Sequence, residues 1–169
     1  MYEAVVYDLD GTLILLDVDW GRVRHEISEL LSEKGVETSA SVWEMYATAQ
    51  ERGIDEVEEI IRRHEVEGAR FSERLETADE VEFDVPTGVC SLNSEHACRV
   101  GIERHGLDSE IDTVVGRDTE GVDGWKPDPE PLLEAVERLS VDPDDALFVG
   151  NSERDRVTAE KAGVEFRKV

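Results

Sequence analysis

Short apolar runs, each bounded by turn-forming residues, recur along the 169-residue chain and constrain its fold more than any other feature. They predict β-strands at residues 3–9, 87–92, 111–115, 146–149 and 165–169. Helical patterns at residues 93–105, 129–139 and 153–162 separate the last four of these strands. Strands and helices that alternate at this spacing imply right-handed crossovers. We therefore predict an α/β fold, with a Rossmann-like parallel sheet as its core and helices on both faces.

The segment 17–78 departs from this alternation. Its pattern predicts consecutive amphipathic helices at residues 20–34, 39–52, 54–63 and 65–77, with Gly35, Gly53 and Gly68 as breaks. A helical block inserted after the first strand lies over the carboxyl end of that strand and suits a cap that excludes water. The alternative is that these helices simply pack on the sheet. We expect a core of residues 1–16 and 79–169 and a small all-helical cap of residues 17–78.

The charge balance is strongly acidic. Asp and Glu number 42 against 18 Lys and Arg, which gives a formal net charge of −24, and the acids are spread along the whole chain. Concentrated salt shortens the range of the resulting repulsion. The composition is therefore typical of the high-salt cytoplasm of a halophilic archaeon, and an acidic patch for a basic partner is the less favoured alternative.

The same balance excludes several function classes. A net negative chain repels phosphate backbones, so a nucleic acid is not an expected partner. A negatively charged substrate must likewise be met by locally placed donors or a cation. No stretch approaches membrane-spanning length, and two cysteines, Cys90 and Cys98, are too few for a disulfide framework. We expect a soluble cytoplasmic protein with free thiols and no membrane contact.

The first predicted strand ends in Asp8 and Asp10, which are followed by a turn at Gly11. Side chains alternate along a strand, so these two carboxylates point the same way, at the edge where open α/β sheets bind ligands. Such a pair can share a divalent cation, or divide nucleophilic and acid–base work. The similar pair Asp17 and Asp19 lacks the Gly-Thr turn and resembles a capped helix start instead.

Other strand ends supply matching groups. Ser91 ends the second strand and Asn93 follows it, where a hydroxyl and exposed N–H groups make an anion site, although either residue alone is more often a helix N-cap. Lys126, one of only four lysines, lies between Trp125 and Pro127 before a helix, where it can neutralise phosphate. Asn151 and Asp155 follow the fourth strand, and both are hard oxygen donors suited to Mg²⁺.

Taken in order, these pieces resemble the haloacid dehalogenase superfamily, in its phosphoglycolate phosphatase-like branch. Residues 8–12, Asp-Leu-Asp-Gly-Thr, match the first motif of that family, and Ser91 fits the second. Lys126 in Lys-Pro-Asp-Pro fits the third, and residues 150–155, Gly-Asn-Ser-Glu-Arg-Asp, fit the fourth. The first and fourth motifs are specific, and the helical insertion falls where the family places its cap.

The resemblance implies a mechanism and a set of site residues. Asp8 would attack phosphorus to form an aspartyl-phosphate, and Asp10 would protonate the leaving oxygen and then activate water. Ser91 and Lys126 would hold the phosphoryl oxygens, with Gly11, Thr12 and Asn93 beside them. Mg²⁺ would be held by Asp8, Asp10, Asn151 and Asp155. The implied activity is the hydrolysis of a small phosphomonoester such as phosphoglycolate or a sugar phosphate.

One position departs from the family pattern, because Asn151 stands where the family usually has an aspartate that binds the metal. The amide keeps a carbonyl oxygen but loses a charge, so we expect weaker Mg²⁺ binding. Two alternatives therefore remain at this point. One is a phosphotransferase or mutase with the same chemistry, and the other is a catalytically degenerate binding module.

Overall fold

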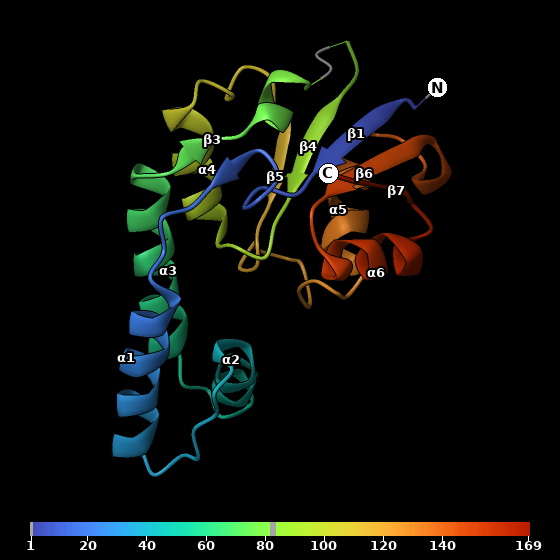
Figure 1. Cartoon of the computed structure of the whole chain (residues 1–169). Coiled ribbons are helices and arrows are strands. Elements are labelled where there is room, and N and C mark those ends of the chain that lie inside the picture. Colours follow the sequence, from blue (N-terminus) through green and yellow to red (C-terminus); the bar gives the residue numbers. More distant parts are fainter. Residues whose placement is uncertain (1, 82–83) are drawn as a thin grey trace.

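The computed structural model describes residues 2–81 and 84–169. A five-stranded sheet with the order β5-β4-β1-β6-β7 forms the centre of the molecule (Figure 1), and all of its strand pairs are parallel. Its strands are β1 Ala4–Tyr7, β4 Thr87–Cys90, β5 Thr113–Val115, β6 Ala146–Gly150 and β7 Glu165–Lys168. The predicted α/β class and parallel sheet are confirmed. Since β1 lies between β4 and β6, the loops after these three strands meet at one edge of the sheet.

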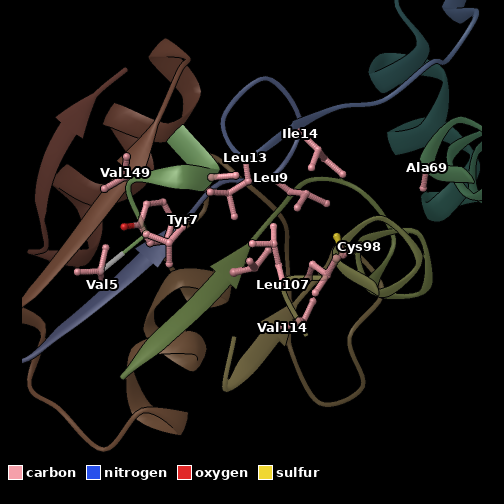
Figure 2. Packing of buried hydrophobic residues seen from close by; sticks show 14 of the residues in the cluster. Val5, Tyr7, Leu9, Leu13, Ile14, Ala69, Cys98, Leu107, Val114 and Val149 are labelled. Carbon is pink, nitrogen blue, oxygen red and sulfur yellow. The ribbon is translucent and has the colours of Figure 1, made fainter. Parts of the chain in front are cut away.

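Helices cover both faces of the sheet, as predicted. Residues of β1 alternate between two apolar clusters: Val5 and Tyr7 belong to one, and Ala4 and Val6 to the other. Helix α4 (Glu95–Arg104) covers the first face, and Figure 2 shows its Cys98 on the side of Leu107 and Val114, in the same apolar cluster as Val5 and Tyr7. Helices α5 (Glu130–Arg138) and α6 (Glu153–Ala162) cover the second face. Burial on both faces explains why the central strands β1 and β6 are continuous apolar runs, whereas the edge strand β7 is mostly exposed and polar.

A helical cap is inserted between β1 and β4. It consists of α1 (Trp20–Glu33), α2 (Val42–Glu51) and α3 (Glu56–Arg70), which extend away from the sheet in Figure 1 and share their own buried apolar cluster. Strands β2 (Ile14–Leu15) and β3 (Glu73–Arg74) pair antiparallel where the chain enters and leaves the cap. Helix α1 begins after Asp19, whose side chain accepts a hydrogen bond from the Arg22 N–H, as the predicted capped start requires.

The second half of the cap differs from the prediction. The helices predicted at 54–63 and 65–77 are one helix, α3, which ends at Arg70, and residues 73–74 form a strand. Gly68 lies inside this helix and does not end it. The position needs a glycine because a Cβ there would come 2.6 Å from the Val18 side chain and 2.9 Å from the Asp17 carbonyl oxygen. Gly35 and Gly53 do follow helix ends, with φ of +69° and +66°.

The sequence predicts two units, a core of residues 1–16 and 79–169 and a cap of residues 17–78, and their independence stays a prediction. Residues 1, 82 and 83 of that core lie outside the described residues. Cys90 and Cys98 are both free and buried. Within residues 2–81 and 84–169, each helix is too short or too polar to cross a bilayer.

Candidate active site

A pocket of about 270 Å³ lies where the loops after β1, β4 and β6 approach the cap. Its lining comes from the three strand ends, from the loop before α5 and from the first two cap helices: Asp8, Asp10, Trp20, Trp43, Leu92, Asn93, Lys126, Asn151, Ser152, Arg154 and Asp155. Six of the predicted site residues are therefore brought together. Gly11, Thr12 and Ser91 lie behind this lining in the described part of the chain.

The floor of the pocket is a buried cluster of two carboxylates around one ammonium. Lys126 Nζ lies 2.7 Å from Asp8 Oδ1 and 2.6 Å from Asp155 Oδ1, and all three residues are at most 5% exposed. Burial alone would lower the pKa of Lys126, but Asp8 and Asp155 outweigh burial and raise it above its ordinary value. The lysine therefore stays charged, and it fixes the position of the Asp8 carboxylate.

The two carboxylates differ in how well their charge is stabilised. Burial, reinforced by the nearby charge of Asp155, raises the pKa of Asp8, although Lys126 opposes this. Burial acts on Asp155 in the same direction, but Lys126 and the Ser152 hydrogen bonds outweigh it and lower the pKa of Asp155. Asp155 Oδ2 accepts from both the N–H and the hydroxyl of Ser152, at 3.0 and 2.6 Å. Asp155 is thus the more firmly ionised partner of Lys126.

The turn after β1 aims Asp8 into the pocket. The Asp8 N–H continues the sheet by donating to the Val149 carbonyl oxygen at 2.8 Å, and the Thr12 hydroxyl donates to Asp8 Oδ2 at 3.2 Å. Gly11 has a φ of +81°, and a Cβ there would lie 2.2 Å from Asn151 Nδ2. The positive φ therefore favours glycine at this position, and any larger residue would also displace the Asn151 side chain.

Asp10 lines the same pocket as Asp8. The predicted strand 3–9 ends at Tyr7, and Asp10 forms an isolated bridge with Ile14, so the turn after β1 and not strand alternation brings the two carboxylates together. Its Oδ1 accepts a hydrogen bond from the Leu16 N–H at 2.9 Å. Burial raises the pKa of Asp10 and the negative charges of Asp8 and Glu65 add to the rise, while the Leu16 hydrogen bond opposes it. A carboxyl group that holds its proton more readily than usual is suited to proton donation.

Ser91 and Asn93 are linked to each other at the end of β4. The Ser91 hydroxyl donates to Asn93 Oδ1 at 3.0 Å, and the Asn93 N–H donates to Ser91 Oγ at 3.1 Å. Neither residue caps α4: the cap is Ser94, whose side chain accepts from the Ala97 N–H. The structural role that competed with an anion site at Ser91 and Asn93 is thus filled by a third residue.

A buried glutamate that the sequence analysis missed connects the cap to this loop. Glu65 of α3 is fully buried, and each of its oxygens accepts two hydrogen bonds. Oε1 accepts from Asn93 Nδ2 at 3.1 Å and Arg117 Nη1 at 2.8 Å, and Oε2 accepts from the Ser94 N–H and Arg117 Nη2, both at 3.0 Å. A signal was present, because Glu65 continues the four-residue spacing of the buried Val57 and Ile61.

Arg117, in the loop after β5, completes this link. It also bonds Glu58 of α3, with Nη2 at 2.7 Å from Oε1, and its guanidinium carbon lies 5.5 Å from the Trp43 ring centroid and 5.4 Å from that of Tyr46. Its side chain is fully buried, and although burial opposes the charge, Glu65 and Glu58 raise the pKa of Arg117. Cap and core are therefore joined by a buried ionic cluster beside the pocket.

Comparison with known proteins identifies the family of this chain. A sequence profile described as haloacid dehalogenase-like hydrolase matches residues 5–169. The chain belongs to the haloacid dehalogenase-like hydrolase family. This confirms the predicted superfamily and makes the chain an enzyme of the hydrolase class.

Relatives of this hydrolase match either nearly its whole length or about half of it. It is 27% identical over 179 residues to a protein named pyrophosphatase PpaX from Oceanobacillus iheyensis, across 99% of this chain and 83% of that one. It is 44% identical over 77 residues to a phosphoglycolate phosphatase from Rhodospirillum rubrum, across 46% of this chain and 31% of that one. A solved haloacid dehalogenase-superfamily hydrolase from Geobacter sulfurreducens, 28% identical, matches 98% of this chain and 88% of its own with a TM-score of 0.62.

The hydrolase offers a sparse but suitable set of donors for Mg²⁺. In residues 2–81 and 84–169, no group of three or more His, Cys, Asp or Glu side chains gathers to hold a metal ion. Asp155 accepts hydrogen bonds from Lys126 and Ser152, and Asp8 likewise accepts from Lys126 and Thr12, so both oxygens of each of these two predicted ligands are already hydrogen-bonded. Asp8, Asp10, Asn151 and Asp155 all bring hard oxygen donors to the pocket, and a carboxylate oxygen can accept from more than one partner. Because protein-bound Mg²⁺ keeps several waters and needs only one or two carboxylates besides substrate oxygens, these residues fit the ion.

Proposed function

We propose that this hydrolase is a Mg²⁺-dependent phosphatase that acts on a small phosphorylated metabolite through an aspartyl-phosphate on Asp8. The observation that carries the proposal is the Asp8 carboxylate, held 2.7 Å from Lys126 in a small pocket that Asp10 also lines. The names of the relatives, pyrophosphatase and phosphoglycolate phosphatase, support a phosphate substrate. The cavity of about 270 Å³ supports a small one, since pockets that hold drug-sized ligands measure about 300–1,000 Å³.

In the first step an Asp8 oxygen attacks phosphorus, the bond from phosphorus to the leaving oxygen breaks, and Asp10 gives its proton to that oxygen. In the second step Asp10 takes a proton from water, whose oxygen attacks the aspartyl-phosphate and releases phosphate and the Asp8 carboxylate. Asp8, the backbone carbonyl of Asp10, Asn151 and Asp155 would hold Mg²⁺, which would neutralise phosphate charge when bound.

The remaining residues position and stabilise these groups. Lys126 faces the developing phosphoryl charge, with Asp155 holding its ammonium at 2.6 Å. Ser91 turns its hydroxyl from Asn93 to a phosphoryl oxygen, and the Gly11–Thr12 turn carries the backbone close to the substrate. We also propose a salt-rich cytoplasm as the setting, which the net charge of −24 supports.

The test is phosphate release from an aryl phosphate, pyrophosphate and phosphoglycolate in molar KCl, with and without Mg²⁺. Asp8→Asn should lower kcat for metal-dependent turnover by about a thousandfold or more. Asp17→Asn, at an exposed aspartate outside the pocket, is the matched control and should retain activity. Transfer of phosphate to an added sugar phosphate without release would favour the phosphotransferase or mutase alternative. No turnover by folded wild-type protein at saturating Mg²⁺ would favour the binding module and refute the proposal.

A further inference from the structure

Two cationic side chains line the pocket, and their surroundings are opposite. Lys126 is 3% exposed and is engaged by two carboxylates. Arg154, in the first turn of α6, is exposed, and its guanidinium makes no ion pair or hydrogen bond within the described residues. It is therefore the pocket cation that is available to a ligand.

The neighbours of Arg154 explain why it is available. Glu153, directly before it, is bound by Arg156, with Nη2 to Oε1 at 2.5 Å. Arg156 also bonds Glu160 at 2.9 Å, one turn further along the helix. Asp155, directly after Arg154, accepts hydrogen bonds from Lys126 and Ser152. The nearest acids in sequence are thus paired with other groups, which leaves the planar guanidinium of Arg154 free to donate hydrogen bonds to two oxygens of one anion.

The rest of the pocket wall offers an anion little other unpaired positive charge. Asp8, Asp10 and Asp155 bring three carboxylates to the lining, and the chain as a whole carries a net charge of −24. On the cap side the wall consists of Trp20 and Trp43, whose rings lie 5.8 Å apart. Among the described residues that line this pocket, Arg154 alone offers an anionic leaving group a positive charge that no carboxylate already pairs.

We propose that Arg154 determines specificity by binding a second anionic group, a phosphate or a carboxylate, on the leaving group of the substrate. The inference rests on the proposed phosphatase function and narrows it to small phosphate compounds whose leaving group is itself charged. Diphosphates and phosphorylated hydroxy acids share this chemistry. Alkyl phosphates with an uncharged leaving group lack it.

The test compares Arg154→Gln with Arg156→Gln, a matched control whose guanidinium is bound to Glu153 and Glu160. The readout is the ratio of kcat/KM for pyrophosphate or phosphoglycolate to kcat/KM for ethyl phosphate, in molar KCl with Mg²⁺. Arg154→Gln should lower this ratio by about tenfold or more, mainly through KM, because a bidentate charge-assisted contact is lost. Arg156→Gln should keep it. The pyrophosphate and phosphoglycolate arms separate a phosphate from a carboxylate as the second anion.

A binding measurement keeps this inference separable from the proposed function. All three tryptophans belong to one aromatic cluster at the cap, and Trp20 and Trp43 line the pocket, so tryptophan fluorescence should report occupancy. Pyrophosphate should bind wild-type protein more tightly than Arg154→Gln by about tenfold. If wild type hydrolyses nothing but this difference appears, the function fails and the anion subsite stands. A ratio and a binding constant within twofold of wild type in Arg154→Gln would overturn the inference.

Discussion

Replacement of Glu65 by glutamine tests how the cap is held on the core. Four donors face the Glu65 carboxylate, and each oxygen accepts one from Arg117 and one from the loop after β4. Glutamine offers one oxygen and an NH₂ group. Whichever way the amide turns, one Arg117 nitrogen and one loop nitrogen lose their acceptor and face another donor.

The magnitude follows from the burial of both partners. Removing one member of a buried ion pair costs about 3–5 kcal/mol. Arg117 keeps its bonds to Glu58, so we expect the lower limit, about 3 kcal/mol. In a domain of this size each kcal/mol lowers Tm by about 2–4 °C, which gives a loss of about 6–12 °C. Because salt screens buried pairs only weakly, the loss should persist in molar KCl.

Thermal unfolding of Glu65→Gln beside wild type measures this loss, with Glu67→Gln as the control on the same helix. Glu67 has a side chain that is 66% exposed, and its partner Arg70 lies 4.0 Å away, so this variant should stay within about 0.5 kcal/mol of wild type. A Tm shift of less than about 2 °C for Glu65→Gln would show that the ionic cluster does not hold the cap, and would refute the reasoning.

Three further variants probe the pocket. Asn151→Asp should tighten Mg²⁺ binding by about tenfold through the added charge, and a calorimetric titration that gives an unchanged Kd would contradict this. Gly11→Ala should lower Tm more than Gly121→Ala, since both glycines have positive φ but only a Cβ at Gly11 meets another group, at 2.2 Å; equal losses would show that this collision is relieved. Asp155→Asn tests linkage. Burial disfavours the Asp155 charge, but Lys126 and Ser152 outweigh burial and lower the pKa of Asp155 below 3.8. Its contribution to stability is therefore present above pH 3.8 and is lost as the pH falls through the lowered pKa. The Tm difference between wild type and Asp155→Asn should accordingly narrow in strong acid, and a constant difference would argue against ionic stabilisation.

Local pattern was sufficient for the sheet and for most of the pocket. The strands that carry Asp8, Ser91 and Asn151 are buried on both faces, so each appears as a continuous apolar run that ends in a polar group. Because the carboxyl ends of parallel strands lie at one edge of a sheet, the prediction of a parallel sheet was enough to expect these groups at the same edge.

Long-range contacts account for what local pattern missed. Gly68 resembles a helix end, yet it sits inside α3 because the chain around Val18 passes close to it. Glu65 resembles one more acid among the 42, and its role depends on Arg117, which lies far away in sequence. The pairing of β2 with β3 involves only two residues on each side, too few to give a strand pattern.

The short ladder between β2 and β3 has a consequence for how such an enzyme can change its substrate. The chain leaves the core and returns to it through directly paired residues, Ile14 with Arg74 and Leu15 with Glu73. Everything between them is one continuous stretch of sequence, so it can be exchanged as a cassette while the sheet keeps its strand order. A cap segment moved to another core would need an arginine at the position of Arg117, because the buried Glu65 of the cap pairs with that residue of the core. The cap side of the pocket wall, which Trp20 and Trp43 form, can therefore diverge through this one segment, provided that this pair of charges is inherited together.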